Sequence, residues 1–174
     1  KIEAYCDFFV EINSDEDFIS LLQIEIYKKS EKLILGGGSN ILFTKNFHGL
    51  VIKNNLKGIS VTSENGNDVT VKVAAGEVWH EFVMWCIENN YGGLENLSLI
   101  PGCVGAAPMQ NIGAYGVEIK ETFVELEAYH LSTGEKKLFN GEECGFGYRE
   151  SVFKHQFKII WSIRFIQNLV YRWD

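Results

Sequence analysis

The residues best suited to chemistry form a glycine-rich stretch and not a set of acids, bases or nucleophiles. Residues 101–116, PGCVGAAPMQNIGAYG, hold both prolines of the chain. Glycine lets the backbone approach a ligand closely, and proline fixes φ and removes a donor, so this central stretch is a shaped backbone surface. Its N–H groups and small side chains suit a flat or anionic ligand. A tight loop packed on its own domain is the other interpretation.

A second glycine-rich segment, residues 36–40 (GGGSN), follows a short apolar run and is called the glycine loop below. Several folds hold phosphate with a strand that leads into such a loop. Ile41 stands where the Rossmann fingerprint needs a third glycine, and no Lys-Ser/Thr pair follows as in a P-loop. A plain turn would explain a glycine triplet equally well. Two such nearly uncharged surfaces would together suit a long ligand with a pyrophosphate in its middle.

Arg149 is the charged residue that stands out, because it lies among glycine and aromatic residues in segment 144–155, CGFGYRESVFKH. Arginine presents a planar fork of donors that pairs bidentately with a carboxylate. An ordinary ion pair with Glu150 or another acid is the simpler explanation from the residues alone. The sequence has no Ser-His-Asp order, carboxylate pair or metal-ligand cluster, so a cofactor would have to carry any chemistry.

The elements that must position these segments follow from the pattern of apolar residues. A helix is expected after Ser14, which forms a capping pattern with Asp17. Hydrophobic alternation predicts the remaining elements: strands at 5–12, 32–35, 50–54, 58–61, 69–76 and 158–166, a helix at 78–90, and a hairpin at 122–131 and 136–139. This order predicts an α+β chain with two lobes, residues 1–65 and 66–166.

Composition limits the partners that the chain can have. Its 174 residues are 46% hydrophobic, enough to bury a core. The formal charge of -7 has no basic block to offset it, which argues against a nucleic-acid or acidic-membrane partner. The four cysteines have no CxxC spacing, and no apolar run could span a bilayer. We therefore expect a cytoplasmic protein with free thiols.

Four segments together resemble a known family: GGGSN at 36–40, AAGEVWHEF at 74–82, the run 93–116, and ECGFGYRESVFK at 143–154. They closely resemble the UDP-N-acetylenolpyruvoylglucosamine reductases, which are flavoenzymes of bacterial peptidoglycan synthesis. The resemblance covers nearly all of residues 1–166. It implies a two-lobed FAD-binding fold of the vanillyl-alcohol-oxidase type, with NADPH as reductant and a small-molecule UDP-sugar as substrate.

The resemblance also assigns residues to FAD by their position. The glycine loop would hold the pyrophosphate, and the central stretch would line the flavin and its phosphates. The expected cofactor contacts are Gly36, Gly37, Gly38, Ser39, Asn40, Ile41, Pro101, Gly102, Ala106, Ala107, Gln110, Asn111, Gly113, Ala114, Tyr115 and Gly116.

Arg149, in its YRES context, matches the catalytic arginine of that family. There NADPH reduces FAD, and the flavin passes hydride to an enolpyruvyl group to give UDP-N-acetylmuramate for the cell wall, and hence for cell shape and division. A fixed guanidinium would stabilise the negative charge pushed toward the substrate carboxylate. Tyr171 would correspond to a tyrosine near the substrate diphosphate.

The resemblance ends before the domain that grips the UDP-sugar and supplies a proton-donating serine in that family. We therefore expect an FAD-binding portion without the carboxyl-terminal substrate domain, of which 167–174 would be the start. Such a chain would be a monomer, incomplete for turnover alone. The alternatives are a non-catalytic flavin or nucleotide-binding module, and an unstable remnant that needs a partner chain.

Overall fold

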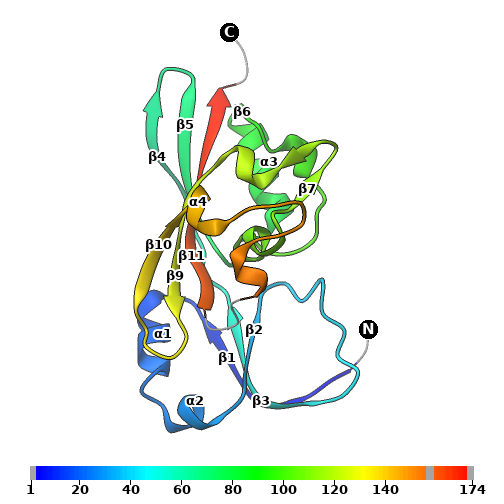
Figure 1. The fold of residues 1–174 in the computed structure, drawn as a ribbon, viewed down its shortest axis with the longest axis vertical. Coiled ribbons are helices and arrows are strands. Elements are labelled where there is room, and N and C mark those ends of the chain that lie inside the picture. The colour runs from blue at the N-terminus through cyan, green and yellow to red at the C-terminus, as the bar shows by residue number, and fades with distance from the viewer. Residues whose placement is uncertain (1–2, 156–158, 172–174) are drawn as a thin grey trace.

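Two β-sheets organise the chain, one below the other in Figure 1. The structure, a computed structural model, describes residues 3–155 and 159–171, the latter for their backbone only. The lower sheet has the order β1-β3-β2, with both pairs parallel. Its strands are β1 (Cys6–Ile12), β2 (Lys32–Leu35) and β3 (Phe47–Asn54), and β1 is joined to β2 by α1 (Asp15–Leu21) and α2 (Glu25–Lys29).

The predicted helix start at Ser14 is confirmed. The Ser14 hydroxyl accepts a hydrogen bond from the N–H of Asp17 at 3.1 Å, and the Asp17 carboxylate accepts one from the N–H of Ser14 at 3.0 Å. This reciprocal box satisfies two backbone donors that a helix leaves unpaired. It directs Phe18 and Leu21 of α1 into a buried cluster with β1, β3 and Tyr27 of α2.

The upper sheet is antiparallel, with the order β10-β9-β11-β5-β4, and β6 pairs with β11. Its strands are β4 (Ile59–Asn65), β5 (Asp68–Ala74), β6 (Tyr91–Gly92), β9 (Phe123–His130), β10 (Lys136–Asn140) and β11 (Ile159–Tyr171). Residues 59–65, expected in the first lobe, thus pair in the second sheet. Residues 167–171, expected to begin another domain, continue β11. Where the lobes divide stays a prediction.

Helix α3 (Trp79–Glu88) supplies much of the larger core. Trp79, Phe82, Val83 and Cys86 are buried, and each fully buried large side chain stabilises the fold by about 1.5–3 kcal/mol. The Trp79 indole N–H donates to the carbonyl of Leu97 at 2.7 Å, so the helix also holds the chain that leads into the central stretch.

The segments around the central stretch are short turns of helix and two-residue strands. They are η1 (Glu95–Leu97), η2 (Val104–Gln110), β7 (Gly113–Ala114), β8 (Val117–Glu118), η3 (Ile119–Glu121), α4 (Gly141–Cys144) and η4 (Val152–Lys154). The central stretch is therefore η2 followed by the turn of a small β7–β8 hairpin.

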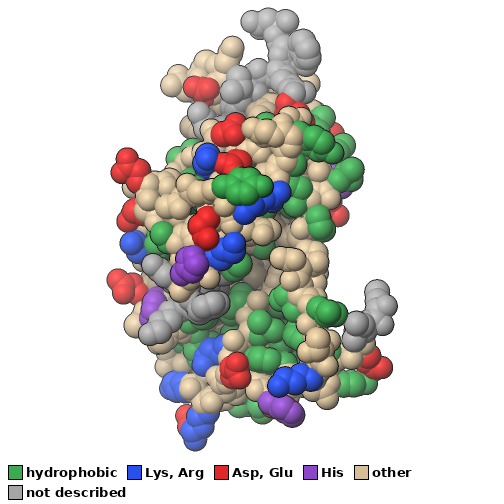
Figure 2. Space-filling view, turned by 45° about the vertical axis from the view of Figure 1, so that its right-hand side comes forward, with side chains coloured by type: hydrophobic (Ala, Val, Ile, Leu, Met, Phe, Trp, Pro, Cys, Tyr) green, Lys and Arg blue, Asp and Glu red, His purple; other side chains and the backbone are tan. Residues whose placement is uncertain are grey.

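The surface of the lower lobe carries exposed apolar side chains. Figure 2 shows hydrophobic groups gathered over the lower part of one face, and Phe8, Phe9 and Leu42 are among the exposed large hydrophobics of this lobe.

All four cysteines are free thiols, as expected. Among the described residues, no helix is long and apolar enough to cross a membrane, and no group of three or more His, Cys, Asp or Glu could hold a metal ion.

Candidate functional site

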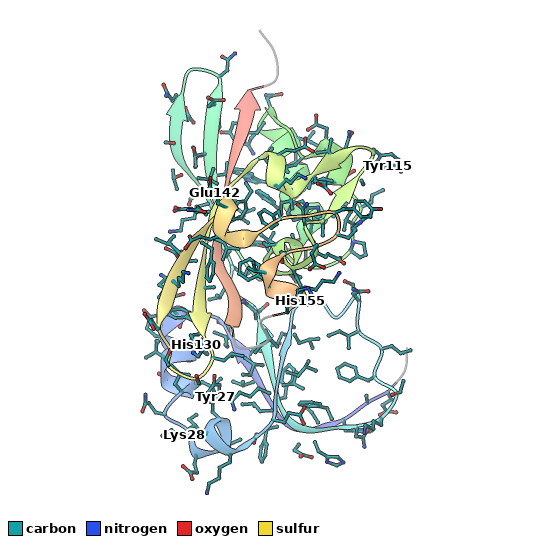
Figure 3. All side chains as sticks on the ribbon, viewed as in Figure 1. Tyr27, Lys28, Tyr115, His130, Glu142 and His155 are labelled. Atoms are coloured by element: carbon teal, nitrogen blue, oxygen red, sulfur yellow. The ribbon has the colours of Figure 1, made fainter. Side chains whose placement is uncertain are left out.

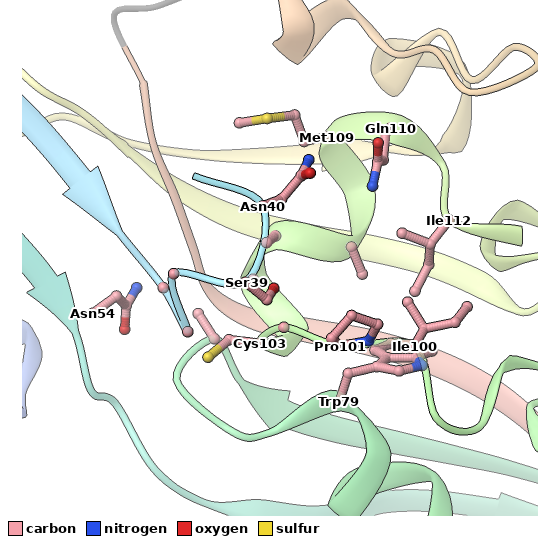
Figure 4. A pocket seen from close by; sticks show the side chains of 18 of the residues that line it. Ser39, Asn40, Asn54, Trp79, Ile100, Pro101, Cys103, Met109, Gln110 and Ile112 are labelled. Atoms are coloured by element: carbon pink, nitrogen blue, oxygen red, sulfur yellow. The ribbon is translucent and has the colours of Figure 1, made fainter. Parts of the chain in front are cut away.

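The glycine loop and the central stretch, about sixty residues apart in sequence, meet across one cavity of about 300 Å³. Figure 4 shows side chains of both segments directed into this space. Eleven of the sixteen expected cofactor contacts line the cavity: Gly36, Gly37, Gly38, Ser39, Asn40, Ile41, Pro101, Gly102, Ala106, Ala107 and Gln110. The glycine loop and the central stretch therefore share a groove, as their interpretation as one binding site requires.

The two segments approach each other closely at Gly37 and Gly102. A Cβ atom added to Gly37 would lie 3.5 Å from both the Cα of Gly102 and the Sγ of Cys103. Gly102 has φ +127°, a conformation that residues with side chains rarely adopt. A Cβ atom at Gly37 would thus make only ordinary van der Waals contacts, and glycine is required at Gly102 because of its positive φ.

The other side of the central stretch is fixed to the end of β5 and the start of α3. The N–H of Gly105 donates to the carbonyl of Ala75 at 2.9 Å, and the N–H of Val104 donates to that of Glu77 at 2.9 Å. The N–H of Trp79 donates to the carbonyl of Gly102 at 3.0 Å. These bonds make the central stretch a firm wall of the cavity.

The glycine loop presents backbone donors to the cavity. Gly38, Ser39 and Asn40 line it, and no described residue accepts a hydrogen bond from their N–H groups. Lys154 of η4 is the one charged residue among the described residues of the wall. A mostly apolar wall with adjacent free N–H groups and a single cation suits a flat apolar group joined to phosphate.

Cys103 lies on the cavity wall but is not a ready nucleophile. Burial raises the pKa of its thiol, and the charge of Lys57 and the hydrogen bond from the Gly37 backbone only partly oppose this. The thiol is therefore neutral at pH 7, and the thiolate is the nucleophilic form. Cys103 is therefore not suited to covalent catalysis at neutral pH.

Five expected cofactor contacts lie away from the cavity wall. Asn111 is fully buried behind it. Gly113 and Ala114 form β7, and Tyr115 and Gly116 form the tip of the β7–β8 hairpin, where the Tyr115 ring is 89% exposed and points outward (Figure 3). Their roles as cofactor contacts stay predictions.

The cavity is also lined by ten residues that were not among the expected cofactor contacts: Ile34, Asn54, Ala75, Trp79, Ile100, Cys103, Gly105, Met109, Ile112 and Lys154. Several belong to the segments that carried the family resemblance, so a signal for them was present. Ile34 and Asn54 come from β2 and β3 and had no such signal. Only the folding of the lower sheet brings them to the cavity.

Arg149 lies in a tight turn, residues 147–150, called the arginine turn below. Gly147 and Glu150 exchange backbone hydrogen bonds of 3.0 and 3.2 Å, and Arg149 has φ +52°. Its side chain is exposed and outside the cavity wall. No ion pair of Arg149 with Glu150 or another acid is present among the described residues. The Glu150 carboxylate lies 3.3 Å from His155 Nε2 and 4.0 Å from Lys154 Nζ, and it accepts a hydrogen bond from the N–H of Ser151 at 3.0 Å.

Tyr171, expected near a substrate diphosphate, lies in β11 opposite Tyr91 of β6. Its side chain is outside the described part of the structure. Its role stays a prediction.

Known proteins with similar sequences are named as reductases. Residues 6–136 match the family described as FAD binding domain. The chain is 52% identical over 157 residues to the UDP-N-acetylenolpyruvoylglucosamine reductase of Flavobacterium johnsoniae, a match that covers 90% of this chain and 46% of the relative. It is 58% identical over 127 residues to the same reductase of Amoebophilus asiaticus, covering 73% of this chain and 38% of the relative. The chain spans about half the length of the curated relatives it matches.

Solved structures share the fold. The UDP-N-acetylenolpyruvylglucosamine reductase of Thermus caldophilus superposes with a TM-score of 0.68 at 21% identity, covering 94% of this chain and 54% of that one. The 6-hydroxy-D-nicotine oxidase of Arthrobacter nicotinovorans superposes with a TM-score of 0.71 at 13% identity, covering 98% of this chain and 38% of that one. The fold is the expected α+β FAD-binding fold of the vanillyl-alcohol-oxidase type. The chain therefore belongs to the FAD binding domain family and is homologous to the amino-terminal, FAD-binding portion of the UDP-N-acetylenolpyruvoylglucosamine reductases.

Proposed function

We propose that this chain is the FAD-binding portion of a reductase that uses NADPH to convert UDP-N-acetylglucosamine enolpyruvate to UDP-N-acetylmuramate in peptidoglycan synthesis. The observation that carries the proposal is the meeting of the glycine loop and the central stretch at one cavity. Relatives that are 45–58% identical bear the reductase name. When bound, FAD would take hydride from NADPH and deliver it to the enolpyruvyl group.

The residues of the cavity fit FAD. The N–H groups of Gly38, Ser39 and Asn40 have no described acceptor and would bind the pyrophosphate. The apolar wall, including Ile100 and Pro101, would exclude water from the flat ring system. The chain thereby supplies binding and orientation, and the cofactor supplies the redox chemistry.

Arg149 would bind the carboxylate of the enolpyruvyl group. A non-glycine residue with positive φ costs on the order of 1 kcal/mol, and such strain gathers at functional sites. This strained turn presents a guanidinium that forms no ion pair within 4.0 Å among the described residues, although its charge contributes, after Lys120 and Asn111, to the lowered pKa of the Glu118 carboxyl. A fixed fork of donors would stabilise the negative charge that develops on the carboxylate as hydride is added.

Titration of the 174-residue chain with FAD, followed by the quenching of flavin fluorescence, tests the cofactor assignment directly. Saturable binding is expected, and anaerobic bleaching of bound FAD by NADPH would show that the reductive half-reaction resides here. Gel filtration of the same sample checks the expectation of a monomer. Absence of FAD binding would contradict the proposal. FAD binding with no bleaching would favour the non-catalytic module.

The role of Arg149 is tested with Arg149→Lys in a chain extended to the full length of its relatives. Lysine keeps the charge and loses the planar fork. Reoxidation of the reduced flavin by substrate should slow on the order of 10²-fold, whereas FAD affinity and reduction by NADPH should stay within twofold. Equal reoxidation rates in variant and parent would remove Arg149 from the reaction.

A further inference from the structure

Asn111 makes its side-chain contacts with residues outside the cavity wall. Its side chain is fully buried, and its backbone is left-handed, with φ +42°. The amide Nδ2 donates to the carbonyl of Gly147 at 2.9 Å, and Oδ1 accepts from the N–H of Lys120 at 3.2 Å. The pKa of the nearby Glu118 carboxyl is lowered, chiefly by Lys120 and to a smaller extent by the Asn111 amide and the charge of Arg149. Both ends of the buried amide are thus engaged, as burial of such a group requires.

Gly147 is the first residue of the arginine turn, so the Asn111 amide joins the end of η2 directly to that turn. Two more bonds connect the turn to the cavity wall. The Ser151 hydroxyl donates to the carbonyl of Met109 at 2.7 Å, and the Lys154 ammonium donates to the carbonyl of Arg149 at 2.9 Å. Met109 and Lys154 both line the cavity. The position of Arg149 therefore depends on the segment that forms the wall.

We propose that Asn111 is a positioning residue for Arg149: its amide holds the arginine turn against the flavin-binding segment. The inference rests on the proposed function for the role of Arg149. Because Arg149 occupies a strained backbone conformation, the turn relaxes once an anchoring bond is removed. Loss of the Asn111 amide moves the guanidinium away from its working position and leaves the cavity wall in place.

Asn111→Gly tests this, because glycine keeps the left-handed backbone and removes only the amide. Asn90→Gly is the matched control, since Asn90 is also left-handed, with φ +60°, but is exposed at the end of α3. Amide hydrogen exchange in the 174-residue chain is the first measurement. The N–H groups of Gly147 and Glu150 should exchange about tenfold faster in Asn111→Gly, the effect of losing roughly one hydrogen bond. Exchange in β5 should be unchanged, and Asn90→Gly should match the parent throughout.

Flavin kinetics in the extended chain are the second measurement. Asn111→Gly should slow reoxidation by saturating substrate about tenfold, with FAD affinity and reduction by NADPH within twofold of the parent. The inference would be overturned if the N–H groups of Gly147 and Glu150 exchanged at the parental rate in Asn111→Gly. It would also be overturned if the flavin of this variant were reoxidised at the parental rate. An equal loss of FAD affinity would overturn it too, because Asn111 would then serve the cofactor.

Two further variants keep the outcomes separable. If exchange in β5 also rises in Asn111→Gly, the same measurements are made on Asn111→Ser, whose shorter side chain cannot reach the Gly147 carbonyl. The Arg149→Lys chain serves as the reference for the proposed function. If Arg149→Lys reoxidises its flavin at the parental rate, the role of Arg149 itself is contradicted. If reoxidation is slow in Arg149→Lys but parental in Asn111→Gly, only the positioning role of Asn111 is contradicted.

Discussion

The contact between Gly105 of η2 and Ala75 at the end of β5 fixes one wall of the cavity, and Gly105→Ala should break it. A Cβ atom on residue 105 would lie 2.6 Å from the Cβ of Ala75 and 3.2 Å from its carbonyl oxygen. Carbon atoms in ordinary contact are separated by about 3.5–4.0 Å. The two segments must therefore separate by roughly 1 Å, and no flexible side chain is available to move instead.

This separation has two energetic consequences. Overpacking a filled site costs about 1–3 kcal/mol, and the 2.9 Å hydrogen bond from Gly105 to Ala75 would be stretched, with a loss of about 0.5–1.5 kcal/mol. The free energy of unfolding should therefore fall by about 2–4 kcal/mol. With a urea dependence of about 2 kcal/mol per molar, the midpoint of unfolding should fall by about 1–2 M. FAD affinity should also fall, because Ala106 and Ala107 move with η2.

Urea unfolding followed by circular dichroism, together with FAD titration, measures both effects. Gly141→Ala is the matched control, because a Cβ there would meet only the Phe123 ring at 3.9 Å at the start of α4. Alanine at that position should leave stability unchanged or raise it by up to about 1 kcal/mol. A Gly105→Ala chain with the parental midpoint and FAD affinity would refute the tight contact and the rigid wall inferred from it.

Two other predictions concern stability alone. Burial raises the pKa of Cys86 and of Cys144 to about 12 from an ordinary value of 9.0, so the folded chain retains these protons while the unfolded chain loses them. The free energy of unfolding measured in urea should therefore be nearly constant from about pH 7 to 9 and fall above pH 9 by about 1.4 kcal/mol per pH unit for each thiol, less steeply in Cys86→Ala; a flat profile to pH 11 would contradict the burial of the thiols. Ser14→Ala removes the cap of α1 and should lower the unfolding free energy by about 0.5–2 kcal/mol without changing FAD affinity, and an unchanged melting temperature would show that the capping box is dispensable.

Local features of the fold could be predicted because they depend on residues that are neighbours in sequence. Ser14 and Asp17 form the helix start that their types and spacing indicated. The strand at 32–35 and the glycine loop after it stand where the apolar run and the glycines placed them. The ends of strands that pair with distant parts of the chain were harder to predict. β11 runs to Tyr171 because β5 and β6 pair with it there.

The central stretch shows where prediction from glycine content reaches its limit. Glycine is needed both where backbone faces a ligand and where a turn requires positive φ. Gly105 lies on the cavity wall without a positive φ, whereas Gly116, with φ +81°, closes the hairpin beyond Tyr115. The residue type is the same in both places, so composition could not separate the two uses.

The sequence by itself determined which segments are bare backbone, where α1 and α3 begin, and that a cofactor would have to carry the chemistry, because residue type and spacing control these locally. Tertiary structure decided which of those segments share a cavity and what completes its wall. Asn54 and Lys154 stand exactly one hundred residues apart yet line the same space. Their meeting depends on the pairing order of two sheets, and that order is set by the burial of the whole core and not by any one stretch of chain.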